Sequence, residues 1–129
     1  MIILAPISVG ELLDKLSILY IKLDKIKDEE KLKHVAKEAH LLETIVHNNK
    51  INEHADYKHL MARLAVVNTD LWDLEDKVRD LYRSRDIGHS LIQTAQAIHI
   101  TNDKRMRIKG LINTTYNSNI VEVKSYKEF

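Results

Sequence analysis

The sequence predicts an all-α protein, an elongated antiparallel bundle of about five helices with an extended C-terminal tail. Its 129 residues, 44% hydrophobic and 30% charged, suit one globular domain spanning 1–129. Three Gly and one Pro are too few for the many tight turns of a β-sandwich or barrel. Leu, Ile and Val recur instead at alternating spacings of three and four, which is the pattern of helices with one apolar face.

The first helix is predicted to begin at the capping box Ser8-Val9-Gly10-Glu11. In such a box Ser8 accepts from the third helical amide, and the Glu11 side chain reaches back to the Ser8 amide. The apolar residues 2–6 before it are expected to be extended. A heptad seam follows the cap and comprises Leu12, Leu16, Leu19, Leu23 and Ile26.

The second helix is expected after a polar reversal at residues 27–30 and ends at Asn48-Asn49. Its apolar positions again alternate in spacing between three and four: Leu32, Val35, Ala39, Leu42 and Val46. Two heptad helices joined by a short polar link are typical of an antiparallel hairpin.

The third helix, over residues 57–83, carries the most regular pattern in the chain. Its seam has eight positions: Tyr57, Leu60, Leu64, Val67, Leu71, Leu74, Val78 and Leu81. At 1.5 Å per residue this helix is ~40 Å long, more than the ~36 Å diameter of a sphere of this chain length. We therefore expect an elongated molecule, and a homodimer in which the long helix meets a partner helix.

Two shorter helices are predicted after the break at residues 84–88. The fourth covers 87–100, and the fifth covers 103–113 behind a fresh N-cap signal at Thr101-Asn102-Asp103. Gly110 within the fifth helix is expected to mark a close backbone approach. The β-branched tail at 120–126 is expected to be a short strand or an extended clamp.

Charge is distributed unevenly along the chain, although its net value is only +1. Residues 1–76 hold 10 basic and 14 acidic side chains, and residues 77–109 hold 8 basic and 3 acidic ones. Either oppositely charged helices pack together, or the basic segment forms an anion site. No nucleic-acid partner is predicted, because the fifth-helix cations have no interleaved aromatic residue: Lys104, Arg105, Arg107 and Lys109.

Several chemistries are not expected from this composition. The chain has no Cys, which excludes disulfides and thiolate ligands, and no apolar run of the ~20 residues that a membrane span needs. With no signal-peptide pattern, the expected location is cytoplasmic and no membrane partner is predicted. His40, Glu43 and His47 share a helix face, and Asp14 with Asp73 and Asp76 weakly resembles helical magnesium sites. Neither set has the full spacing, so no metal or cofactor is predicted.

A polar stripe beside the third-helix seam is the first half of a candidate site: Asn68, Trp72, Glu75 and Arg79. The second half lies on the predicted fifth helix: Asn102, Asp103, Arg105, Lys109 and Asn113. In one interpretation the stripe packs inward, with Trp72 in the core and Glu75–Arg79 as an ordinary ion pair. In the other, the two groups face each other across a cleft, where Arg105 and Lys109 suit an anionic ligand such as a nucleotide sugar.

Four motifs together resemble a family of small, uncharacterised bacterial and phage proteins catalogued as a domain of unknown function. The matching residues are 7–16 (ISVGELLDKL), Asn68 with Leu71-Trp72 and Glu75-Asp76, 102–113, and 122–126 (EVKSY). The resemblance implies a stand-alone helical domain, sometimes found beside sugar-transfer and surface-polysaccharide proteins. It implies no catalytic residues.

Two functions follow as hypotheses. The first is a non-catalytic helical interaction or scaffold module that self-associates and can also bind a protein partner. The alternative is a protein that binds a nucleotide, nucleotide sugar or other anion, or an enzyme acting on one, at the polar cleft. Whether the chain is an enzyme is left open.

Overall fold

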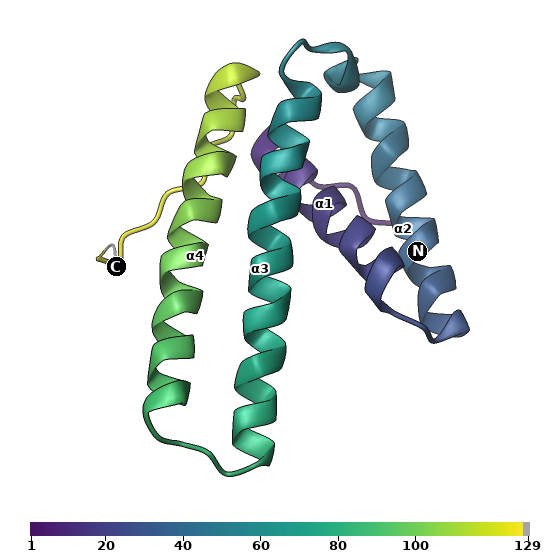
Figure 1. The fold of residues 1–129 in the computed structure, drawn as a ribbon. Helices are drawn as coiled ribbons and strands as arrows, with labels where there is room; N and C mark the ends of the chain where they lie inside the picture. Colours follow the sequence, from purple (N-terminus) through teal and green to yellow (C-terminus); the bar gives the residue numbers. More distant parts are fainter. Residues whose placement is uncertain (128–129) are drawn as a thin grey trace.

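Four α-helices make up the fold of residues 1–127, the part of the chain that this computed structural model describes. They are α1 (Val9–Lys25), α2 (Glu29–Asn48), α3 (Tyr57–Arg83) and α4 (His89–Thr115), with a short 3-10 turn η1 (Ile51–Glu53) before α3. No strand is present between residues 1 and 127, which confirms the all-α class. Figure 1 shows α3 and α4 side by side, with α1 and α2 packed beside the part that contains the start of α3.

The central element is α1, which contacts all three other α-helices. Eight of its 17 residues are buried, including Leu13 and Leu16 with no exposed surface. The predicted cap is confirmed in its first half, because Ser8 Oγ accepts from the Glu11 amide over 3.0 Å. The Glu11 carboxylate, however, accepts from Lys109 on α4.

The core lies at one end of the α3–α4 pair. We call residues 57–70 and 101–115 the proximal half of this hairpin, and residues 71–83 and 89–100 its distal half. The α3 residues in the core, Leu60, Leu64 and Val67, are all proximal. In the distal half the only buried residue is Thr94, and the seam leucines there are half-buried.

The prediction of separate fourth and fifth helices is wrong, because α4 is continuous from His89 to Thr115. Residues 89–109 contain no Gly or Pro. The N-cap sequence Thr101-Asn102-Asp103 is therefore not preceded by a residue that would end the helix. Thr and Asn cost only a few tenths of a kcal/mol in a helix. Thr101 is buried, so packing of the continuous helix outweighs that cost.

The close backbone approach predicted at Gly110 is also wrong. A Cβ built there would meet nothing within 4 Å. The approach occurs at Gly10 instead, where a Cβ would lie 2.6 Å from the Lys109 carbonyl oxygen and 2.9 Å from Asn113 Oδ1. Gly10 therefore lets α1 and α4 pack with their backbones in near contact.

The tail from residue 118 to 127 is extended and forms no strand. It is attached to α4 through Glu122, which agrees with the clamp interpretation and not with the strand. None of the helices within residues 1–127 combines the length and apolar character needed to cross a membrane.

Candidate functional site

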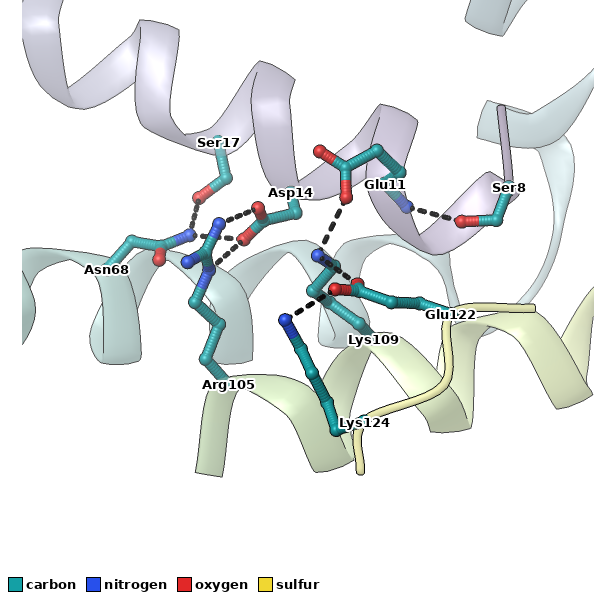
Figure 2. Close-up of polar contacts among 9 residues, drawn as sticks. All are labelled: Ser8, Glu11, Asp14, Ser17, Asn68, Arg105, Lys109, Glu122 and Lys124. Carbon is teal, nitrogen blue, oxygen red and sulfur yellow. Dashed lines mark hydrogen bonds and ion pairs between the residues drawn. The ribbon is translucent and has the colours of Figure 1, made fainter. Parts of the chain in front are cut away.

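A buried ion pair joins α1 to α4. Arg105 Nε donates to Asp14 Oδ1 over 2.9 Å, and Arg105 Nη2 donates to Asp14 Oδ2, so the two groups meet in the parallel, two-bond geometry (Figure 2). The Asp14 side chain is 1% exposed and that of Arg105 is 27% exposed. The hydrogen bonds to Asp14 raise the pKa of Arg105 above its already high ordinary value. Arg105 therefore keeps its positive charge at any ordinary pH.

Helix α3 completes this site through the side-chain amide of Asn68. Asn68 Nδ2, buried on α3, donates to Asp14 Oδ1 over 3.0 Å and approaches Ser17 Oγ at 3.4 Å. The Asp14 carboxylate thus receives hydrogen bonds from both α3 and α4, which is how a buried charge is made tolerable. These contacts fix the three helices around one polar point.

A second charged cluster lies further along α4. Lys109 Nζ donates to Glu11 Oε2 over 2.7 Å and to Glu122 Oε2 over 2.8 Å. The Lys109 side chain is only 5% exposed. Burial opposes its charge, but the hydrogen bonds to the two carboxylates outweigh burial and leave the pKa of Lys109 raised.

Glu122 lies between two ammonium groups, because its other oxygen accepts from Lys124 over 2.9 Å. Hydrogen bonds from Lys109 and then Lys124 lower the pKa of Glu122 to about 2. Figure 2 shows this carboxylate reaching from the tail to the same surface of α4 that meets Glu11 of α1.

A cavity of about 530 Å³, which we call the Trp72 cavity, lies between α1, α3 and α4. Both halves of the sequence-predicted site contribute to it: Asn68, Trp72, Glu75 and Arg79 from α3, with Asn102 and Arg105 from α4. Ile18, Ile21, Leu71 and Asp76 complete its lining. Trp72 is half-buried, lines this space and lies outside the main hydrophobic core cluster.

The Glu75–Arg79 pair belongs to the rim of this cavity. Arg79 Nη1 donates to the Glu75 carbonyl over 3.0 Å and to Glu75 Oε2 over 3.3 Å. The two side chains are 47% and 61% exposed, so the pair is screened by water.

A second cavity of about 670 Å³, which we call the Lys109 cavity, shares Asn102 and Arg105 with the first. Two more residues of the predicted site, Asp103 and Lys109, line it. Its other walls come from α1, α4 and the tail: Glu11, His99, Met106, Glu122, Lys124, Tyr126 and Lys127. The predicted residues therefore divide between two adjoining spaces.

Asn113 lines neither cavity and has a structural contact. Its Oδ1 accepts from the Gly10 amide over 2.7 Å, and both residues are buried. That amide is among the first of α1 and has no partner within its own helix, so Asn113 caps α1 from a distant helix.

Five residues of these clusters were not predicted as site residues from the sequence, and they come from α1 and the tail: Glu11, Asp14, Ser17, Glu122 and Lys124. Local patterns explained Ser8 and Glu11 as a cap, and the pairing of Asp14 with Arg105 spans 91 residues. The available signal was the charge imbalance between residues 1–76 and 77–109. Within residues 1–127, no group of three or more His, Cys, Asp or Glu side chains is placed to hold a metal ion.

Comparison with known proteins assigns the chain to a family without assigning it an activity. Residues 3–128 match the model of the family of unknown function DUF6165, so the chain belongs to that family. No curated protein and no solved structure matches it.

Proposed function

We propose that this protein binds a small ligand with a polar ring in the Trp72 cavity. The observation that carries the proposal is the convergence of six predicted polar or aromatic residues, from two separate helices, on one space. Its volume of about 530 Å³ lies within the ~300–1,000 Å³ typical of small-molecule sites.

The lining indicates the chemistry of the ligand. Trp72 offers a face on which a ring stacks, Ile18 and Ile21 add an apolar wall, and the amides of Asn68 and Asn102 offer polar contacts. Two carboxylates and two guanidinium groups balance in charge, and each Arg already has a carboxylate partner. This balance favours an uncharged polar ring, such as a sugar or a nucleobase, over a polyanion.

Intrinsic fluorescence tests the proposal directly, because Trp72 is the only tryptophan in the chain. Nucleosides, methyl glycosides and nucleotide sugars would be titrated against the protein. We expect a saturable change in Trp72 emission with one of these classes, and weaker binding in Asn102→Ala. At 100 times the dissociation constant, binding adds ~2.7 kcal/mol of stability, or a rise of roughly 8–13 °C in Tm.

The matched control is His59→Ala, an exposed α3 residue outside both cavities. It should bind the same ligand with unchanged affinity. If no class of compound changes either the fluorescence or the Tm, the cavity is not a ligand site and the proposal fails.

The distal half of the hairpin supports a second candidate function, self-association as an interaction module. Its seam residues Leu74, Val78 and Leu81 stay half-buried, and Tyr82 and Ile92 are 62% and 58% exposed. Figure 1 shows the α3–α4 turn lying beyond the ends of α1 and α2. A second copy of the hairpin would convert two helices into a four-helix bundle.

Sedimentation over a range of protein concentrations tests this dimer. Ile92→Glu should shift the equilibrium toward monomer without unfolding the chain. Val66→Glu changes an apolar residue of comparable exposure in the proximal half and should leave the equilibrium unchanged. A wild-type protein that stays monomeric at all concentrations contradicts the dimer. The cytoplasmic location, the absence of nucleic-acid and membrane partners and the link to surface polysaccharide stay predictions.

A further inference from the structure

The Lys109 cavity has the construction of an anion site that the protein itself fills. The Glu122 carboxylate lies between Lys109 Nζ at 2.8 Å and Lys124 Nζ at 2.9 Å. One of these ammonium groups belongs to a side chain that is only 5% exposed. A nearly buried lysine and a second lysine converging on one carboxylate is how proteins hold phosphate and carboxylate groups.

The occupant comes from the tail, which lies outside the four helices. Glu122 lies on an extended segment that forms neither helix nor strand with the bundle. Its side chain is 31% exposed, so it can swing into water while the tail backbone keeps its place. The cavity of about 670 Å³ beside it leaves room for an incoming group.

We propose that the Lys109 cavity binds the phosphate group of a ligand, which takes the place of the Glu122 carboxylate between Lys109 and Lys124. The first negative charge of the phosphate replaces that of the Glu122 carboxylate, so it adds no new repulsion with Glu11 and Asp103. Lys127 also lines the cavity and would compensate the second charge of a phosphate.

The position of this anion site also narrows the ligand class, a step that rests on the proposed function. Asn102 and Arg105 form a wall common to both cavities. One ligand molecule could therefore place its ring in the Trp72 cavity and its phosphate in the Lys109 cavity, with the bond between them lying beside Arg105. The ligand class is a phosphate ester of a ring compound, either a nucleotide or a sugar phosphate.

Calorimetric titration with inorganic pyrophosphate tests the anion site by itself, since pyrophosphate has no ring. Glu122→Gln removes the competing charge but keeps the shape of the side chain. We expect Glu122→Gln to bind pyrophosphate about tenfold or more tightly than the wild type, the difference expected of a charged hydrogen-bond partner. Adding Lys124→Met to this variant should reverse most of that gain, and Lys124 is exposed enough for the chain to fold without its charge.

The matched control is Glu38→Gln, which removes the acid of an exposed ion pair between α2 and Lys15 of α1. If Glu122→Gln binds pyrophosphate no more tightly than wild type or Glu38→Gln, the anion site is refuted. An equal gain in both acid variants would reflect net charge alone and would also refute it.

Trp72 fluorescence separates this inference from the proposed function. If pyrophosphate binds Glu122→Gln but no ring compound changes the emission, the anion site stands and the ring site fails. If a nucleoside or methyl glycoside changes the emission while pyrophosphate does not bind, the ring site stands and the anion site fails. Titration with a nucleoside monophosphate and a hexose phosphate distinguishes the two ligand sources.

Discussion

The proximal and distal halves of the α3–α4 hairpin share one apolar periodicity and differ in what covers them. Leu64 in the proximal half has no exposed surface, whereas Leu74, ten residues further along the same seam, is half-buried. The proximal half packs on α1 and contains the charged contacts of Arg105 and Lys109. Hydrophobic spacing therefore selects the inward face of a helix, but the amount of burial depends on which elements reach that face.

Two ion pairs, one formed from each half of the hairpin, should show the largest contrast. Arg105→Ala leaves the Asp14 carboxylate, 1% exposed, without its cation, and we expect unfolding to become easier by about 3–5 kcal/mol. Arg79→Ala in the distal half removes an exposed pair and should cost only about 0.3–0.5 kcal/mol. Urea denaturation of both variants measures the difference. Similar values would contradict the division into a buried and a solvated half.

A pair of truncations on the same seam compares packing alone. Leu64→Ala should destabilise the protein by about 2–5 kcal/mol, because it opens a cavity in the core. Leu74→Ala removes a half-buried side chain, and roughly 1 kcal/mol is expected. If the distal half dimerises, the cost of Leu74→Ala will grow with protein concentration and that of Leu64→Ala will not. Equal costs at every concentration would show that the distal half is as well packed as the core.

The two glycines give opposite signs for the same substitution. Gly10→Ala places a methyl group 2.6 Å from the Lys109 carbonyl oxygen, and about 1–3 kcal/mol of stability should be lost. Gly110→Ala meets open space within a helix and should stabilise the protein by roughly 0.5–1 kcal/mol. Thermal unfolding of the two variants measures both changes in stability. If Gly110→Ala is less stable than the wild type, the α4 surface at Gly110 is covered.

The smallest effect concerns attachment of the tail. Because the pKa of Glu122 is lowered to about 2 from an ordinary 4.5, its ion pairs contribute fully above pH ~4.5. That contribution should be lost as the pH falls from ~4.5 through about 2. The NMR titration of the Glu122 carboxyl group measures it directly, and a midpoint near 4.5 would show that the tail is not bound to Lys109. In Glu122→Gln the neighbouring tail amides should lack this titration.

How far the sequence predicts the structure varies along the chain. The range of α3, residues 57–83, and the Ser8 cap follow from local spacing and hydrogen-bonding rules, and both are confirmed. The split of α4 was wrong because a cap signal is weak when no breaker accompanies it. The polar stripe on α3 and the basic residues on α4 were identified as a candidate site, but their division between two cavities was not.

By itself, the amino-acid sequence determined the helical class, the inward faces and the candidate polar residues, because these depend on neighbours three or four positions apart. The other contacts come from the three-dimensional packing: Asp14 meets Arg105, Glu122 reaches Lys109, and Gly10 rather than Gly110 is the close contact. These contacts join segments that are distant in sequence, and Asp14 and Arg105 are 91 positions apart. No periodicity encodes which surfaces meet at that range, and packing of the whole chain settles it.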